Sequence, residues 1–309
     1  MPYALFLLVG PDPIEIDRLR DLFAAITVYE ADSIGRCDIF IANDGNTALD
    51  ELSTLLGTFR NTIIFDNPGR GVSPHVWDRH INGTFAGLQH ITQTDQYQFV
   101  LKLDCDALVI APFVQRLAQF FANYPRAGAI GTHLHFPCGK SRPGNFTMTQ
   151  HIQQAMQAIP VPERIATADN AAYEKRVPAT QLERQQLIQA ARQNGHFGSQ
   201  HVQGGGYALS ATLLSTLRDR RWPTSIDLFN GTGLGEDVAT AILVKAAGLE
   251  LMDCNHPGEV FGVWWQQLGL SLDEIVRRDY AVIHSIKDIG HQREAEIRRY
   301  FAARRETHG

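Results

Sequence analysis

Short apolar runs alternate with predicted helices in the first third of the chain. Four runs have the length of a buried strand and are followed by turn-forming or acidic residues: Tyr3–Gly10, Cys37–Ala42, Asn61–Phe65 and Phe99–Leu103. Helices are predicted between these strands, over Ile14–Ile26, Leu49–Phe59 and Val76–Ile91. Strands that alternate with helices predict an α/β fold, in which a mainly parallel sheet is flanked by helices on both faces.

In the second half of the chain, predicted strands and helices alternate less regularly. The segment Gly139–Gly195 is rich in Gln, Arg, Ala and Pro and is predicted to be an insertion. A capping-box pattern, Thr180–Glu183, opens a polar helix there that is expected to stop at Gly195. The remaining elements are predicted as helices at Glu236–Ala247 and after the capping box Ser271–Glu274, a strand at Tyr280–His284 and a basic helix at Glu294–Arg305.

The composition describes a globular chain with no overall affinity for nucleic acid. Of its 309 residues 44% are hydrophobic, which excludes an intrinsically disordered protein. The 28 basic and 33 acidic residues leave a formal net charge of −5, whereas nucleic-acid-binding domains are usually strongly basic. A length prior of about 150 residues per domain allows two domains. No linker or repeat divides the sequence, so one domain is predicted.

Membrane and cysteine signals point to the cytoplasm. No apolar run reaches the roughly 18 to 20 residues that cross a bilayer, and Ala4–Val9 lacks the basic residues that precede a signal sequence. The four cysteines are scattered without Cys-x-x-Cys spacing, so we expect neither a disulfide framework nor a structural zinc site. A reducing, cytoplasmic location is therefore expected.

Acidic residues follow the predicted strands. Asp44, Asp66, Asp104 and Asp106 fall at the carboxyl ends, where open α/β sheets bind their ligands. Asp104 and Asp106 share one side of an extended chain and would repel each other, so a divalent cation is their natural partner. The alternative is an ordinary turn, because aspartates are common after strands.

Glu236 and Asp237 begin a predicted helix and follow a glycine-rich loop. Acidic side chains at this position can simply complement the helix dipole. A carboxylate held there can also act as a general base toward a hydroxyl group. The sequence alone leaves both interpretations open.

His284 ends a predicted strand, and Lys287 lies three residues further on. A single histidine is often a hydrogen-bonded structural residue, but imidazole also joins carboxylates around Mn²⁺. A neighbouring lysine is suited to contact phosphate oxygens. Before these residues, the run Gly204–Gly206 is either a mobile turn or a place where the backbone closely approaches a sugar or another chain segment.

Taken in order, these motifs resemble the GT-A glycosyltransferases. The motifs are Ile41–Gly45, Lys102–Asp106 (Lys-x-Asp-x-Asp), Gly204–Ser210, Gly235–Val238 and His284–Lys287. The resemblance spans about residues 3–290 and is greatest to the inverting, metal-dependent kind related to fringe-type galactosyl- and N-acetylglucosaminyltransferases. It implies an α/β fold of the GT-A type and the transfer of a sugar from a nucleotide sugar, with a UDP-sugar expected ahead of a guanosine donor.

The resemblance assigns a metal and a donor site. It implies that Asp106 ligates Mn²⁺ or Mg²⁺ directly, that Asp104 contacts the donor ribose or the metal through water, and that His284 completes the ligands. Asp44 would recognise the uracil ring, and Lys287 would neutralise the diphosphate.

The remaining roles concern the sugar and its acceptor. Asp237 would take the proton from the acceptor hydroxyl, and Glu236 would bind acceptor or orient the helix. The run Gly204–Gly206 would form the floor under the donor sugar, and Lys102 is counted among the substrate-binding residues. The chain departs from the fringe-type pattern at Cys105, where those enzymes usually have an acid, and in the short spacing between His284 and Lys287.

The implied layout is a single domain with four parts. They are a donor half at about 1–138, an insertion at about 139–200 that is the expected acceptor-side lid, an acceptor half at about 201–290 and a basic C-terminal helix at about 291–309. The acceptor could be a glycan, glycolipid, protein or small molecule, and the basic helix could rest on an anionic membrane.

Two rival functions use the same features. A sugar-1-phosphate nucleotidyltransferase would need a glycine-rich, basic loop after the first strand, and Val9–Pro13 is a poor phosphate cradle. A non-catalytic glycan- or partner-binding protein on this scaffold would be expected to lose the acid pair, the histidine or Glu236 and Asp237, all of which are present.

Overall fold

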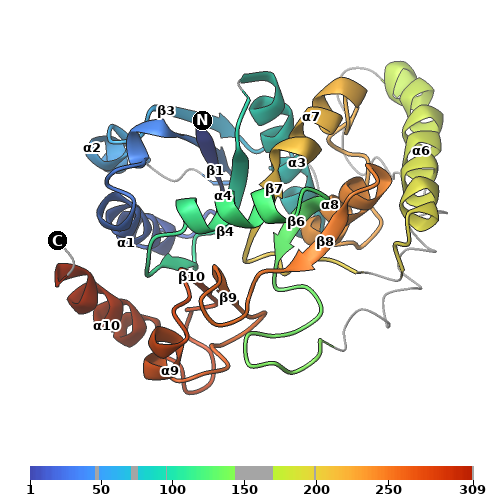
Figure 1. Ribbon diagram of the computed structural model, residues 1–309. Helices are drawn as coiled ribbons and strands as arrows, with labels where there is room; N and C mark the ends of the chain where they lie inside the picture. The colour runs from blue at the N-terminus through green and yellow to red at the C-terminus, as the bar shows by residue number, and fades with distance from the viewer. Residues whose placement is uncertain (46–48, 71–75, 95, 143–169, 198–199, 308–309) are drawn as a thin grey trace.

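The protein is a mixed α/β structure built around a seven-stranded sheet (Figure 1). The computed structural model describes residues 1–45, 49–70, 76–94, 96–142, 170–197 and 200–307. The strand order is β3-β2-β1-β4-β7-β6-β8. The strands are β1 (Tyr3–Val9), β2 (Cys37–Asn43), β3 (Asn61–Asp66), β4 (Phe99–Asp104), β6 (Ala127–Gly131), β7 (Gly206–Ser210) and β8 (Glu250–Asp253). The predicted α/β class is confirmed.

Parallel pairing brings the acidic ends of the first strands to one edge of the sheet. Strands β1, β2, β3 and β4 run parallel, with Leu8 opposite Ala42 on one side and opposite Asp104 on the other. Strand β7 is antiparallel to both β4 and β6, and its pairing sets Gly206 opposite Leu103. The chain before β7 therefore enters the sheet beside the acidic end of β4.

Side chains alternate along β1 between two cores. Leu5 and Leu7 face one core with α1 (Ile14–Tyr29), while Phe6 faces the other with α3 (Val76–Thr94). Both faces are covered, so β1 is apolar throughout, as expected for a central strand in a parallel sheet. Gly87 of α3 makes the approach possible, because a Cβ there would lie 2.4 Å from the Phe6 ring.

The helices divide between these two layers. The layer of α1 also contains η1 (Ile34–Arg36), η2 (Leu49–Leu52), α2 (Ser53–Leu56), α4 (Val114–Asn123), α9 (Leu272–Arg277) and α10 (Glu294–Glu306). The layer of α3 also contains α6 (Asn170–Gln193), α7 (Ala211–Arg220) and α8 (Glu236–Ala246). In Figure 1, α6 stands at the opposite end of the molecule from α1 and α10.

A second, three-stranded sheet completes the edge where the acidic residues lie. Its order is β5-β10-β9, from β5 (Leu108–Val109), β9 (Phe261–Val263) and β10 (Val282–His284). Strand β5 follows directly after Asp106 and pairs antiparallel with β10. The backbone N–H of Ile286 also donates to the carbonyl of Asp106, at 3.2 Å. This pairing carries His284 from the far end of the sequence to the end of β4.

Several sequence expectations were wrong in detail. Strand β3 was expected to be buried, but it is the edge strand of the large sheet and its residues are exposed or half-buried. The predicted helix Leu49–Phe59 is only the short turns η2 and α2. Helix α6 begins at Asn170, so Thr180–Glu183 is not its capping box; its end before Gly195, which has a φ of +78°, matches the prediction.

The predicted insertion at 139–200 is only partly within the described residues. Leu187, Ile188 and Ala191 of α6 are buried in the same core as α8. This part of the insertion therefore belongs to a structural layer of the domain. The lid expected over the acceptor would have to come from the remainder of the insertion, most of which lies outside the described residues.

Helix α10 is fixed to α1 by ion pairs. The guanidinium groups of Arg298 and Arg305 each lie 2.9 Å from a carboxylate oxygen of Asp21. Two of the arginines that could meet a membrane therefore have an internal partner. Among the helices of the described residues, none is both long and apolar enough to cross a bilayer.

A buried ion pair closes the amino-terminal edge of the sheet. The Asp38 carboxylate is fully buried and accepts hydrogen bonds from Arg60, Asn61 and Tyr97 at 2.5 to 2.9 Å. Burial alone would raise the pKa of Asp38, but these donors outweigh it and hold the pKa below its ordinary value. Such a group stabilises the fold above its unfolded-state pKa, and its contribution is lost as pH falls.

We predict that Asp38→Asn lowers the free energy of unfolding by about 2 kcal/mol at pH 7, because Arg60 loses its buried charged acceptor. The difference from wild type should shrink as the pH falls below about 4, where the unfolded carboxyl becomes protonated. Urea unfolding of both proteins at pH 7 and pH 3 measures this difference in unfolding free energy. The exposed Asp17, paired with Arg20, provides the control Asp17→Asn, for which we expect almost no change.

Candidate active site

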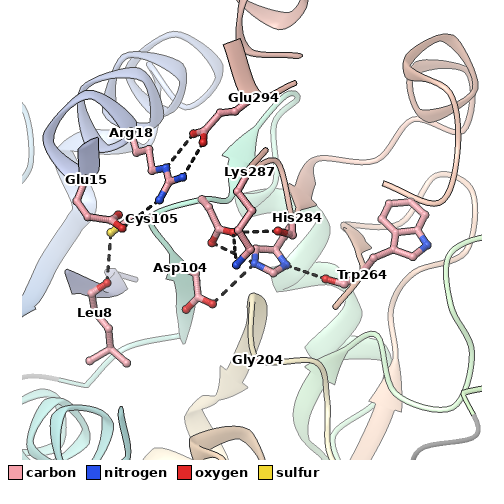
Figure 2. Close-up of polar contacts among 12 residues, drawn as sticks. Leu8, Glu15, Arg18, Asp104, Cys105, Gly204, Trp264, His284, Lys287 and Glu294 are labelled. Atoms are coloured by element: carbon pink, nitrogen blue, oxygen red, sulfur yellow. Dashed lines mark hydrogen bonds and ion pairs between the residues drawn. The ribbon is translucent and has the colours of Figure 1, made fainter. Parts of the chain in front are cut away.

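Asp104 at the end of β4, Asp106 just beyond it and His284 at the end of β10 form one cluster. Figure 2 labels Asp104 and His284 of this cluster. One ligand atom from each of Asp104, Asp106 and His284 lies within 4.8 Å of the others. The His284 Nε2 atom is 3.1 Å from Asp106 Oδ1 and 3.8 Å from Asp104 Oδ2. The side chains of Asp106 and His284 are 8% and 5% exposed, whereas that of Asp104 is 35% exposed, so the cluster opens to solvent on the side of Asp104.

The surroundings fix the His284 ring and the Asp106 carboxylate. The Nδ1 atom of His284 hydrogen-bonds the Trp264 carbonyl at 2.8 Å, which leaves Nε2 facing the aspartates. Burial lowers the pKa of His284, but the nearby Asp106 and Asp104 raise it overall. Burial would likewise raise the pKa of Asp106, yet His284, Lys287 and Ser285 hold it far below the ordinary range.

The donor atoms of the cluster suit a divalent cation. Carboxylate oxygens bind both Mn²⁺ and Mg²⁺. The imidazole, whose other nitrogen is held by a carbonyl, favours Mn²⁺ over Mg²⁺. The ligand atoms already lie close together, so Asp104, Asp106 and His284 fit the expected metal.

Gly204 and Gly205 carry no side chains and so leave room for the side chains of Glu236 and His284. A Cβ on Gly205 would lie 2.1 Å from the His284 ring, and a Cβ on Gly204 would lie 2.6 Å from Glu236 Oε1. The Gly205 carbonyl also accepts the backbone N–H of Asp104 at 3.2 Å. Glycine is therefore required here for close approach of other chain segments, which is one of the two interpretations left open by the sequence. A floor under a donor sugar stays a prediction.

A buried lysine connects the cluster of Asp104, Asp106 and His284 to helix α8. The Lys102 Nζ atom donates to Asp104 Oδ1 at 2.5 Å, to the Gly204 carbonyl at 2.7 Å and to Glu236 Oε1 at 3.3 Å. Burial opposes its charge, but these acidic neighbours keep the pKa of Lys102 above its ordinary value. With its ammonium group used by protein acceptors, Lys102 holds Asp104 and Glu236 at a fixed separation. Its predicted contact with substrate remains untested.

Asp237 lies next to Glu236 but faces a different set of residues. Its Oδ2 atom is 3.5 Å from His201 Nε2, and its side chain is 16% exposed. The same His201 nitrogen lies 2.9 Å from an Arg142 guanidinium nitrogen, which can only donate. Arg142 also donates to the carbonyls of Thr132 and His133. The His201 nitrogen that accepts from Arg142 has no proton for Asp237, so the positive charge near this partly accessible carboxylate is that of Arg142.

Asp44 lies at the same sheet edge, at the end of β2. Its carboxylate accepts a hydrogen bond from Asn67 at 3.0 Å and lies 3.6 Å from Arg79. Burial raises the pKa of Asp44, and Arg79 works in the opposite direction. The structure places Asp44 outside the cluster of Asp104, Asp106 and His284. Its role in base recognition stays a prediction.

Cys105 points away from the cluster, into the protein. Its thiol donates to the Leu8 carbonyl at 3.2 Å and is within hydrogen-bonding reach of Glu15 (Figure 2). Arg18 in turn joins Glu15 to Glu294 at the start of α10. An acid at position 105 would meet a carbonyl oxygen and the Glu15 carboxylate, so this chain favours a neutral residue where fringe-type enzymes usually have an acid.

Sequence reasoning missed several residues of the site. Ser285 donates to Asp106 at 3.0 Å, and Arg142 and His201 lie beside Asp237. Ser285 could have been found, because it follows His284 in the motif. Arg142 and His201 belong to irregular segments with no periodic pattern, and only the folded chain brings them to α8.

Comparisons with known proteins identify distant structural similarity only. Neither a protein-family model nor a curated protein matches the chain. Among solved structures, the galactosyltransferase LgtC, in complex with donor and acceptor sugar analogs, has 12% identity and a TM-score of 0.49, over 99% of this chain and 95% of that chain. Mouse xyloside xylosyltransferase 1 has 12% identity and a TM-score of 0.41, over 92% of this chain and 98% of that chain.

A third solved structure is the mannosyltransferase PcManGT from Pyrobaculum calidifontis, in complex with GDP-Man and Mn²⁺. It has 11% identity and a TM-score of 0.42, over 81% of this chain. This chain spans about half of that protein, 54% of its length. Similarities at this level carry no argument about activity. The α/β architecture therefore rests on the sheets and helices of the chain itself.

We predict that Gly205→Ala displaces the His284 ring, since the added methyl group has no room. The variant should lose about 1 to 3 kcal/mol of unfolding free energy and should bind Mn²⁺ more weakly than wild type. Chemical unfolding and Mn²⁺ titration measure the two effects. Gly35→Ala is the matched control, because a Cβ at Gly35 meets nothing within 4 Å, and it should leave Mn²⁺ affinity unchanged.

Proposed function

We propose that the protein is a GT-A type glycosyltransferase that transfers a sugar from a nucleotide sugar to an acceptor hydroxyl. One observation carries the proposal: Asp104, Asp106 and His284 meet at the carboxyl edge of an α/β sheet. On one side Lys287 reaches Asp106, and on the other Lys102 connects the cluster to the acidic start of α8. This arrangement supports a cation site that lies between a group for phosphate and a group for an acceptor.

The leaving group is the first chemical difficulty that such a site solves. A nucleoside diphosphate departs readily only when its negative charge is balanced, and Mn²⁺ or Mg²⁺ held by Asp104, Asp106 and His284 supplies Lewis-acid charge there. Lys287 adds a second positive charge from a side chain that is 43% exposed and free to reach phosphate oxygens. The donor proposed is a UDP-sugar, with Asp44 recognising the base.

The acceptor must lose a proton as the new bond forms. Asp237 is the proposed general base, since its carboxylate is partly accessible at the start of α8. The Lys102 bridge from Asp104 to Glu236 supports this role, because it fixes the distance between the metal cluster and the helix that carries the base. A base on the side opposite the leaving group gives a single displacement with inversion at the anomeric carbon.

The acceptor class is proposed only broadly, as a glycan, glycolipid, protein or small molecule. A peripheral membrane contact would have to use the face of α10 that does not bind Asp21. A non-catalytic protein on the same scaffold is the alternative that the following experiment would reveal.

We predict Mn²⁺-dependent hydrolysis or transfer when the protein is screened with UDP-sugars, and loss of this activity in Asp106→Asn. Anomeric coupling constants of the product, measured by NMR before mutarotation, should show inverted configuration. Retained configuration would remove Asp237 as the base. Full activity in Asp106→Asn, or none in wild type with any UDP- or GDP-sugar, would contradict the proposed enzyme.

Asp237→Asn should lower kcat by about 100-fold or more, because the amide cannot accept the acceptor proton. The affinity for UDP with Mn²⁺ should remain that of wild type, as Asp237 lies outside the metal cluster. Steady-state kinetics and nucleotide titration test the two parts. Asp219→Asn, which changes an exposed carboxylate of α7, is the control and should leave both quantities unchanged.

A further inference from the structure

Protein side chains contact both carboxylate oxygens of Asp106. Oδ1 lies 3.1 Å from His284 Nε2. Oδ2 accepts the Ser285 hydroxyl at 3.0 Å and lies 3.2 Å from Lys287 Nζ. The three partners follow one another at the end of β10, so this carboxylate is already neutralised by its own chain.

These partners differ in how easily they can leave. His284 is held by the Trp264 carbonyl and packed against Gly205. Ser285 is fully buried and carries no charge. Lys287 is half-exposed, with a long flexible stem, and it is the partner whose charge opposes that of a metal ion.

The backbone around Lys287 is fixed, so only its side chain is free to move. Gln292 donates to the carbonyls of Ser285 and Lys287 at 2.8 and 2.9 Å. Asp288 accepts the backbone N–H of Glu294 at 2.7 Å, and Arg18 clamps Glu294 with two hydrogen bonds (Figure 2). From this fixed base, the flexible stem lets the ammonium group of Lys287 reach either Asp106 or the solvent side.

We propose that Lys287 and the divalent cation compete for Asp106, and that a nucleoside diphosphate relieves the competition by taking over the ammonium group. The inference rests on the proposed function, because it assumes the metal and diphosphate of that site. Metal binding frees Lys287 for phosphate, and phosphate binding frees Asp106 for metal. By linkage each ligand must then raise the affinity for the other by the same factor.

The competition makes a specific prediction about Lys287→Met, which keeps the length of the stem and removes the charge. Without nucleotide, the variant should bind Mn²⁺ about fivefold or more tightly than wild type. The gain in Mn²⁺ affinity on adding UDP should be smaller than in wild type, since the variant has no ammonium group that could move from Asp106 to the diphosphate. Lys287→Arg keeps the charge and should stay close to wild type without UDP.

Electron paramagnetic resonance of free Mn²⁺, with and without UDP, measures these affinities directly. Arg293→Met is the matched control, because Arg293 is an exposed cation of the same segment whose hydrogen bonds go to the carbonyls of Gly290 and Gln292. It should leave Mn²⁺ affinity unchanged. If Mn²⁺ affinity rose equally in Arg293→Met, the effect would come from net charge in general, and direct competition by Lys287 would be contradicted.

The outcomes separate the inference from the function. Equal Mn²⁺ affinity of wild type and Lys287→Met without UDP would overturn the competition, while Mn²⁺ binding that UDP strengthens would still support the enzyme. No Mn²⁺ binding to any variant, with or without UDP, would overturn the metal site itself and the inference with it.

Discussion

The buried carboxylate of Asp106 ties the three-stranded sheet to the end of β4. It lies between the end of β4 and the start of β5; its Oδ2 accepts the Ser285 hydroxyl, and its Oδ1 lies 3.1 Å from His284 Nε2 at the end of β10. A carboxylate in this position is costly to bury without partners. The same donors that make its burial tolerable bring a histidine and a lysine to the carboxyl edge of the large sheet, where the first half of the chain supplies the acids.

Lys102 extends this arrangement to the other half of the site. Its charge is buried, and the carboxylates of Asp104 and Glu236 together with one carbonyl compensate it. Lys102 thus holds together two acidic motifs that lie far apart in the sequence, the one at Asp104 and the one at Glu236. Gly204 and Gly205 complete this arrangement, because any larger residue would separate α8 and His284 from the end of β4.

The sequence predicted the parts of the fold that depend on local patterns. The first parallel strands, helices α1 and α3 and the cap at Ser271 follow from apolar periodicity and turn residues, and the acids were expected at the sheet edge for the same reason. Strands β5 and β9 are two and three residues long, too short for a pattern, and form through their pairing, whereas β10 lies within the predicted strand Tyr280–His284. The placement of Arg142 and His201 beside Asp237 is likewise non-local, so no spacing in the sequence predicts it.

The most direct test of a nucleotide-sugar site is calorimetric titration of UDP into the protein with and without Mn²⁺. The account predicts binding that requires Mn²⁺ and disappears in Asp106→Asn, whose amide is a poorer ligand at the centre of the cluster. Binding of UDP that is indifferent to Mn²⁺ and to this substitution would contradict it. So would the absence of binding by both UDP and GDP at any Mn²⁺ concentration.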